Sequence, residues 1–271
     1  MAREKIPAKE DRRLIHRAGE TVDYPFLFLL LLLMTVGLIM LWSASYAQSE
    51  YDTRYTDSGR YLRKQALCAG IGLMALWLFS RIPAGAWYRF AWPLYGVSIA
   101  LLLSVLVIGQ EVNGAKRWIQ LAGIQFQPSE VAKFAQILLF ARLTRHFGPD
   151  AKIFRYGVLG FAGALMGILV PLALEKHLSA ILLMGMVAVV MMFVAGTRIP
   201  WLLAGAGTAV VFVIVYISIM GYAGDRVSAW LHPELDPGNT GYQILQSLYA
   251  IGSGGLFGLG WGKSRQKYLY L

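Results

Sequence analysis

The feature that most constrains this chain is a run of 26 residues without a charge, from Tyr24 to Ser49. A second uncharged run, 21 residues long, extends from Phe90 to Gln110. About 20 apolar residues are enough for a helix to cross the hydrocarbon core of a membrane. Because 57% of the residues are hydrophobic and only 15% are charged, the sequence predicts an all-α polytopic membrane protein.

The number of spans depends on one segment. Further apolar segments cover residues 62–80, 156–174, 178–196 and 200–221. Segment 128–146 is ambiguous, because the uncharged stretch between Lys133 and Arg142 is short. Counting it makes seven spans and omitting it makes six. In either case the chain divides into a basic tail (1–23), a membrane bundle (24–221) and a polar C-terminal part (222–271).

The basic residues form short clusters between the apolar runs, although the net charge is +10. No surface-sized basic stripe results, so membrane lipids are the expected partner and nucleic acid is not. Cytoplasmic segments are enriched in Lys and Arg, and the N-terminal tail contains six such residues, Arg3, Lys5, Lys9, Arg12, Arg13 and Arg17. We therefore expect a cytoplasmic N-terminus. The charges of the second half are evenly divided and leave its orientation open.

Two polar stretches carry candidate binding residues. In "NGAKRWI", Lys116, Arg117 and Trp118 present two cations beside an aromatic ring, either as part of a site or as an interfacial anchor. In "QPSEVAK", Glu130 and Lys133 lie three residues apart on one helix face. Charges inside a membrane are costly, so this pair either forms the floor of a polar cavity or neutralises itself to permit insertion.

Other classes of site are not supported. The histidines show no metal-ligand spacing, and the single cysteine, Cys68, lies in an expected span, so neither a thiolate metal cluster nor an internal disulfide is possible. Gly262, Lys263 and Ser264 resemble the end of a nucleotide-binding loop. However, Phe257 occupies the position of the required first glycine, so no nucleotide is expected.

The segment "LDPGNTGYQILQSLYAIGSGG" contains the best acid–base candidate, Asp236. The residues that follow it could line a substrate path or form ordinary interhelical hydrogen bonds. They are Tyr242, Gln243, Gln246 and Ser247.

Together, "NGAKRWI", "QPSEVAKFA" and "DPGNTGYQILQSLYAIGSGGLFGLGWGKSRQKYLYL" resemble, in this order, the SEDS family (FtsW and RodA) of bacterial peptidoglycan glycosyltransferases. The last segment is more similar to FtsW than to RodA. The resemblance implies ten spans in the bacterial cytoplasmic membrane, with seven before a large extracellular loop. It further implies polymerisation of lipid II in cell division, with a class B penicillin-binding transpeptidase and other division proteins as partners.

The resemblance also implies roles for individual residues. Asp236 matches the extracellular loop aspartate to which catalysis is attributed in the family. The polar cavity wall would comprise Lys116, Arg117, Trp118, Gln127, Ser129, Glu130 and Lys133. The cations would hold the leaving pyrophosphate, and a divalent cation, Mg²⁺ or Mn²⁺, could assist them, although no metal site is readable. Arg226 should not pair tightly with Asp236, because a nearby cation lowers the pKa of a base.

Two departures from the family pattern limit this assignment. Where the family has a "PDLGT"-like stretch, this chain reads "EKHLSA", which leaves Glu175 and His177 without a role. The family also continues through three further spans, so we expect the chain to be truncated at its C-terminus. A lipid II flippase and a non-catalytic division scaffold are the alternative functions.

Overall fold

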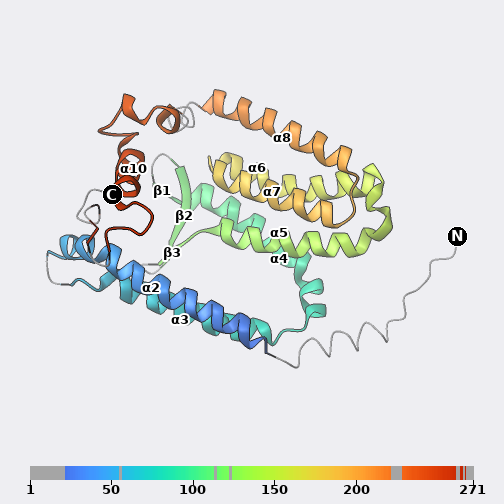
Figure 1. Cartoon of the computed structure of the whole chain (residues 1–271). Coiled ribbons are helices and arrows are strands. Elements are labelled where there is room, and N and C mark those ends of the chain that lie inside the picture. Colours follow the sequence, from blue (N-terminus) through green and yellow to red (C-terminus); the bar gives the residue numbers. More distant parts are fainter. Residues whose placement is uncertain are drawn as a thin grey trace. The chain divides into compact units, whose positions relative to one another are not determined.

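The computed structural model describes residues 22–54, 57–112, 115–121, 124–220, 228–260, 263, 264 and 266. The chain divides into two compact units, one comprising Met1–Ile82 with Tyr216–Leu271 and the other Pro83–Val215. The basic residues of the N-terminal tail, Arg226, and residues Asn113 and Gly114 lie outside the described residues. Figure 1 shows both units with their elements labelled.

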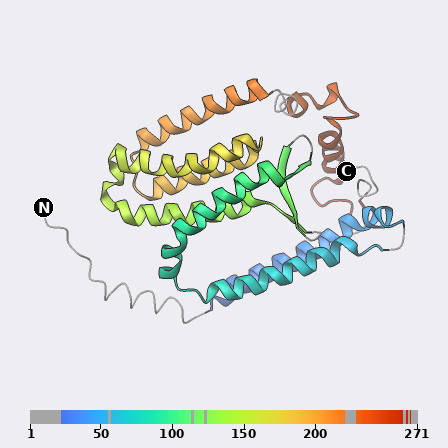
Figure 2. The same ribbon diagram turned by 180° about the vertical axis from the view of Figure 1, so that it is seen from behind.

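The first unit begins with two long helices that lie side by side, α2 (Tyr24–Asp52) and α3 (Arg60–Ser80), as Figures 1 and 2 show. The carboxylate of Asp23 caps α2 by accepting a hydrogen bond from the backbone nitrogen of Phe26 at 3.0 Å, as expected for an N-cap aspartate. Many large apolar side chains of both helices are exposed, and so is Cys68. This distribution is that of helices surrounded by lipid.

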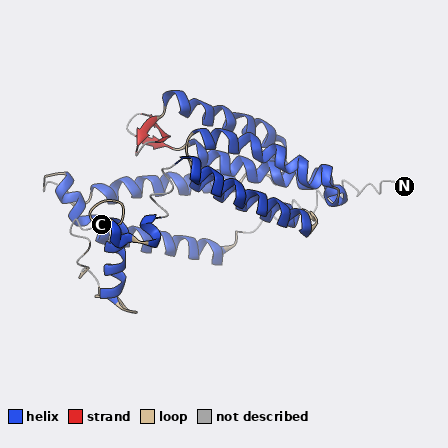
Figure 3. Cartoon of the chain, turned by 90° about the horizontal axis from the view of Figure 1, so that it is seen from above, coloured by secondary structure: helices blue, strands red, loops and turns tan. Residues whose placement is uncertain are grey.

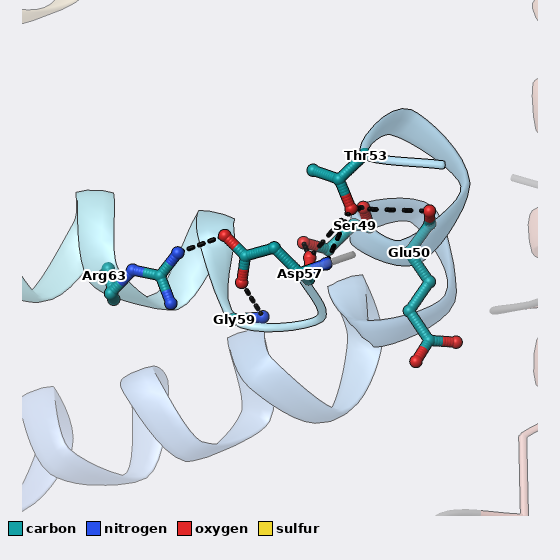
Figure 4. A network of polar contacts seen from close by, with 6 residues as sticks. All are labelled: Ser49, Glu50, Thr53, Asp57, Gly59 and Arg63. Atoms are coloured by element: carbon teal, nitrogen blue, oxygen red, sulfur yellow. Dashed lines mark hydrogen bonds and ion pairs between the residues drawn. The ribbon is translucent and has the colours of Figure 1, made fainter. Parts of the chain in front are cut away.

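A network of polar contacts closes the turn between α2 and α3 (Figure 4). The hydroxyl of Ser49 donates to the backbone oxygen of Asp57 at 2.7 Å, and the backbone nitrogen of Asp57 donates to the hydroxyl of Thr53 at 3.0 Å. The Asp57 carboxylate accepts from the Gly59 backbone nitrogen at 2.9 Å and pairs with Arg63. These bonds satisfy the backbone groups of Asp57 in the turn and the backbone nitrogen of Gly59, the N-cap residue of α3.

The second unit is a helical bundle built around α5. Its helices are α4 (Ala84–Ile108), α5 (Pro128–Phe147), α6 (Phe161–Leu174), α7 (Leu178–Val194) and the first part of α8 (Ile199–Met220). The short helices η1 (Gly148–Lys152) and η2 (Arg155–Gly160) connect α5 to α6. Helix α5 packs against α4, α6 and α7, and Leu139, Phe140, Phe161, Ile168 and Met184 are fully buried in the core.

The structure contains a helix at each of the seven expected spans. Among the described residues, α2, α3, α4 and the segment Arg155–Leu174 are long and apolar enough to cross a membrane, and Leu178–Val194 and Ile199–Val215 are shorter apolar helices. The ambiguous segment is α5. Its buried positions include Ser129 and Gln136, so these two polar side chains face protein. Glu130 is exposed and forms an ion pair with Lys133, which lowers the cost of carrying both charges.

The polar stretch after α4 forms a three-stranded antiparallel sheet that the sequence analysis missed. Its strands are β1 (Gln110–Val112), β2 (Ala115–Leu121) and β3 (Ile124–Phe126). Strand β2 packs against α4 and α5, and Figure 3 shows the sheet in red at one end of these helices. Strands β1 and β3 have only three residues each and carry little periodic signal, so the sequence predicted only part of a site or an interfacial anchor at residues 116–118.

Candidate functional site

Strand β2 positions Arg117 at an irregularity of the sheet. Gln110 pairs with Trp118 and Glu111 pairs with Lys116, so Arg117 is the extra residue of a β-bulge. A bulge bends the strand and redirects the side chain at the extra position. The Nη2 atom of Arg117 donates to the backbone oxygen of Lys176 at 3.2 Å. Lys116 itself is exposed and Trp118 is half-buried.

The turn between α6 and α7 supplies the acceptor for Arg117. The backbone nitrogen of His177 donates to the oxygen of Leu172 at 3.0 Å and that of Lys176 donates to Ala173 at 3.1 Å. Lys176 has a φ of +54°. These two bonds around a left-handed residue form a Schellman motif, which ends α6 and satisfies its last carbonyls.

Glu175 lies beside Arg117 and is buried, with an exposed fraction of 3%. Among the described residues its Oε1 atom has no hydrogen-bond partner, and neither has the buried Nε of Arg117. Burial raises the pKa of Glu175 to about 8, although the charge of Arg117 acts in the opposite direction. Glu175 is therefore protonated at neutral pH and adds no negative charge to the site.

His177 connects the starts of two helices. Its Nδ1 atom accepts from the backbone nitrogen of Ala180 at 3.4 Å and so caps α7. Its Nε2 atom lies 2.7 Å from the side-chain nitrogen of Gln127, the N-cap residue of α5. Burial, followed by the charges of Arg117 and Lys133, lowers the pKa of His177. The ring is therefore neutral near pH 7.

The first turns of α5 supply the remaining polar groups. Pro128 occupies the first helical turn, where its missing N–H costs nothing. Lys133 forms an ion pair with Glu130 at 2.7 Å, a contact that both a charged cavity floor and a self-neutralising pair would contain. Ser129 is buried, and its hydroxyl has no hydrogen-bond partner in the described part of the chain. Gln136, one turn further along, donates to the backbone oxygen of Met184 at 2.9 Å.

The structure thus brings together Arg117, Gln127, Glu130 and Lys133, and it adds Glu175 and His177. With Glu175 protonated and His177 neutral, two cations face one carboxylate, so the cluster carries excess positive charge and suits an anionic ligand. Sequence reasoning noticed "EKHLSA" but assigned it no role. Its polarity between two apolar helices was the available signal, but the contact with β2 is a tertiary one.

Asp236 belongs to the other unit and has its own surroundings. It follows η3 (Pro233–Leu235) and precedes α10 (Tyr242–Gly254). Its carboxylate accepts from the side chain of Asn239 at 3.1 Å, from the backbone nitrogen of Thr240 at 3.2 Å and from the Thr240 hydroxyl at 3.1 Å. These bonds, chiefly that from the Thr240 backbone, hold the pKa of Asp236 below its ordinary value. Asp236 is therefore ionised, half-exposed and held in a fixed orientation.

Helix α10 carries the other candidates of this segment. Tyr242, Gln243, Gln246 and Ser247 all lie in its first two turns. The hydroxyl of Ser247 donates to the backbone oxygen of Gln243 at 2.8 Å, so its hydrogen is already used within the helix. Gln243 is exposed, and the other three side chains are half-buried.

The described residues contain no group of three or more His, Cys, Asp or Glu side chains that could hold a metal ion. Mg²⁺ usually keeps several waters and binds through one or two carboxylates together with substrate phosphates, so such a cation would be held in part by the substrate. Among the residues of the candidate site, Arg117 and Lys133 supply positive charge.

Comparison with known proteins places the chain among bacterial cell-envelope proteins. The FtsW/RodA/SpoVE family model, described as "Cell cycle protein", matches residues 24–271. The probable peptidoglycan glycosyltransferase FtsW of Trichlorobacter lovleyi is 36% identical over 251 residues, which are 92% of this chain and 65% of that protein. Stage V sporulation protein E of Bacillus subtilis is 34% identical over 92% of this chain and 68% of its own length. The chain thus spans about two thirds of the length of these relatives.

Solved structures show the same fold. One, described as "Structural coordination of polymerization and crosslinking by a peptidoglycan synthase complex", has a TM-score of 0.66 and 30% identity over 88% of this chain and 67% of the matched chain. The rod shape determining protein RodA of Thermus thermophilus has a TM-score of 0.60 and 23% identity, over 93% of this chain and 94% of its own. The chain is a multi-pass helical membrane protein and belongs to the FtsW/RodA/SpoVE family of cell cycle proteins.

Proposed function

We propose that this protein is a peptidoglycan glycosyltransferase that polymerises lipid II into glycan strands during cell division. The observation that carries the proposal is the similarity to probable peptidoglycan glycosyltransferases FtsW over 92% or more of the chain. The cationic cluster around Arg117 supports it, because the leaving group of this reaction is a lipid-linked pyrophosphate. The similarity to proteins named FtsW, within a family described as "Cell cycle protein", favours a role in division.

The reaction divides into two tasks. The 4-hydroxyl of the acceptor sugar attacks the anomeric carbon of the donor, and its proton passes to the carboxylate of Asp236. The bond between the anomeric carbon and the phosphate oxygen breaks, and its electron pair leaves with undecaprenyl pyrophosphate. An α-linked donor becomes a β-1,4 product, so the configuration inverts, as in enzymes that place a base and a leaving-group stabiliser on opposite sides of the sugar.

The cations act on the leaving group. Arg117 and Lys133, with Lys116 on the same strand as Arg117, stabilise the charge that develops on the pyrophosphate. Glu130 holds Lys133 through their ion pair. The proposed polar cavity wall also includes Gln127, Ser129 and Trp118. The sugars of the substrate would contact four residues of α10, which are Tyr242, Gln243, Gln246 and Ser247. A divalent cation, Mg²⁺ or Mn²⁺, bound together with the substrate would add further positive charge at the pyrophosphate.

The proposed topology follows from seven crossings and a cytoplasmic N-terminus. The sheet, the start of α5 and the α6–α7 turn would then lie at the extracellular face, and Asp236 would lie in an extracellular loop. The structural neighbour described as a complex for polymerisation and crosslinking supports a class B penicillin-binding protein as partner, which would crosslink the new strand.

The test is glycan-strand synthesis from labelled lipid II in liposomes, with the protein purified together with its transpeptidase. We expect polymer from the parent protein and none from Asp236→Asn. Arg117→Gln and Lys133→Gln should each reduce the rate by about 10-fold or more. Lys152→Gln, which removes an exposed cation from η1, is the matched control and should retain activity.

Each contrary result has a definite meaning. Polymer from Asp236→Asn at the parental rate would remove Asp236 as the base. If the folded parent makes no polymer but moves labelled lipid II between leaflets, the protein is a flippase. If it does neither but still binds the transpeptidase, the protein is a scaffold.

A further inference from the structure

The His177 ring carries two contacts that together determine where its hydrogen lies. Nδ1 accepts a hydrogen bond from the backbone nitrogen of Ala180. A neutral imidazole has one donor nitrogen and one acceptor nitrogen. Because the Ala180 N–H occupies the lone pair of Nδ1, the hydrogen must be on Nε2. An imidazolium ring could not cap α7 in this way, because both of its nitrogens carry hydrogens.

The position of this hydrogen determines the orientation of the Gln127 amide. Nε2 of His177 lies 2.7 Å from a terminal atom of the Gln127 side chain. An N–H of the ring and an NH₂ group cannot both donate along the same line, so the atom against the ring must be the amide oxygen. The NH₂ group then occupies the other terminus of the amide. At that terminus the described residues provide no further hydrogen bond.

Titratable groups on three neighbouring elements lie near the ring. Arg117 reaches it from β2, Glu130 and Lys133 act from α5, and Glu175 lies at the end of α6. Helix α7 carries no charged residue. The NH₂ group of Gln127 therefore lies near two cations, Arg117 and Lys133. All three groups can donate to the same anionic ligand.

We propose that His177 is a positioning residue: by capping α7 through Nδ1 it is held as the Nε2–H tautomer, which orients Gln127 so that its amide nitrogen donates to a pyrophosphate oxygen of the bound polyprenyl substrate. The identity of the ligand rests on the proposed function, whereas the tautomer and the amide orientation do not. The departure "EKHLSA" thereby acquires a role, because its histidine supports the neighbouring side chain of Gln127.

The tautomer can be measured without any activity. We would record ¹⁵N spectra of histidine-labelled protein in lipid bilayers near pH 7, and assign the His177 signals by their absence in His177→Asn. We expect a hydrogen on Nε2 and none on Nδ1. A hydrogen on Nδ1, alone or together with one on Nε2, would overturn the inference.

Binding of undecaprenyl pyrophosphate in nanodiscs tests the role of Gln127. In His177→Asn the side-chain oxygen can still cap α7, but it is too short to reach Gln127. We expect His177→Asn and Gln127→Ala each to weaken binding by about 5- to 10-fold, and the double variant to be no weaker than either single one. Fully multiplicative effects, or unchanged binding in both single variants, would contradict the proposal.

Two further variants complete the design. Gln127→Glu keeps an oxygen for the His177 ring but replaces the donor by a negative charge, so it should bind more weakly than Gln127→Ala. Gln125→Ala, an exposed glutamine on β3, is the matched control and should bind like the parent. Thermal unfolding of every variant verifies that it is folded.

The polymer assay distinguishes failure of the proposed function from failure of the positioning role of His177. If the parent binds undecaprenyl pyrophosphate and the variants weaken this binding, the positioning role stands even when no polymer is formed, and the proposed function fails alone. If polymer is formed and the His177→Asn variant binds and polymerises like the parent, the proposed function stands and the inference fails.

Discussion

Lys176 contributes its backbone rather than its side chain. Its left-handed conformation ends α6 and directs its carbonyl toward Arg117. The neighbouring residues Glu175 and His177 are thereby held within the cluster, one protonated and one neutral. Three consecutive polar residues therefore act in three ways, through a buried carboxyl group, a backbone oxygen and an imidazole ring.

Glu175 should make stability depend on pH. The folded protein keeps its proton up to about pH 8, whereas the unfolded carboxyl group loses it near its ordinary pKa of 4.5. The folded state therefore binds more protons between these values, and its stability falls as pH rises through this window. In thermal unfolding, the parent should lose at least about 5 °C from pH 5 to pH 8. Glu175→Gln should lose much less.

The matched control for this prediction is Glu111→Gln, which changes an exposed glutamate on β1 in the same way. It should show the pH dependence of the parent. Equal slopes in the parent and in Glu175→Gln would mean that the Glu175 carboxyl group is charged in the folded protein at neutral pH.

Asp236 should control the acidic limb of the activity profile. Asn239→Ala combined with Thr240→Val removes two hydrogen bonds that favour the carboxylate, so the pKa of Asp236 should rise. The rate of lipid II polymerisation should then begin to fall at a higher pH than in the parent. The variant Asn239→Asp provides a comparison, because it keeps a side-chain oxygen at position 239 but loses the NH₂ group that donates to Asp236. An unchanged acidic limb would indicate that another group limits the rate.

Among the elements, α5 has the most demanding position. It is the central helix of its unit, and its first turns also supply Lys133 to the cationic cluster around Arg117.

The neighbouring helices α4 and α6 approach each other closely at Gly167, where a Cβ atom would overlap the Tyr95 hydroxyl. That hydroxyl is buried and donates to the backbone oxygen of Ala164 at 2.5 Å. The small residue therefore allows both the close packing and the hydrogen bond.

Gly167→Ala should destabilise the bundle. The added methyl group displaces Tyr95 or separates the helices, at a cost of about 1–3 kcal/mol typical of overpacking. Gly163→Ala is the matched control on the same helix, because its Cβ atom would meet nothing within 4 Å. Thermal unfolding in detergent should show a lower midpoint only for Gly167→Ala. Equal midpoints for the two variants would exclude a tight contact at Gly167.

On the scale of the whole molecule, helix direction decides which groups can meet. In the second unit α4, α5, α6 and α7 alternate in direction, so the sheet, the start of α5 and the α6–α7 turn gather at one end (Figures 1 and 3).

The opposite end of α5 contacts the start of α4. There, Arg142 donates to the backbone oxygen of Tyr88 at 2.8 Å and lies 4.6 Å from the centre of its ring.

This alternation leads to a test of the number of crossings. In a Cys68→Ser background, Gln120→Cys on β2, Asp150→Cys on η1 and Gly238→Cys after Asp236 report three exposed positions. If α5 crosses the membrane, an impermeant maleimide should label positions 120 and 238 in intact cells, and position 150 only after permeabilisation. If α5 does not cross, labelling at 150 and 238 will be reversed.

The membrane class, the apolar helices other than α5 and the family could be predicted from the sequence alone. Apolar runs are local properties, so α2, α3, α4, α6, α7 and α8 could be located from composition alone. The pair Glu130–Lys133 could also be predicted, since its spacing lies within one helix turn. Motifs such as "QPSEVAKFA" and "DPGNTGYQ" sufficed for the family, which the comparisons confirmed.

The contacts that polar residues make between elements depend on tertiary structure and could not be predicted. The sheet depends on pairing across turns, and the bulge at Arg117 depends on the register of that pairing. Whether α5 faces lipid or protein depends on its neighbours, because the same polar residues are costly in lipid and satisfied inside a bundle. Glu175 and His177 join the cluster for a similar reason: Arg117 meets their turn 59 residues away along the chain, and no local pattern records such a contact.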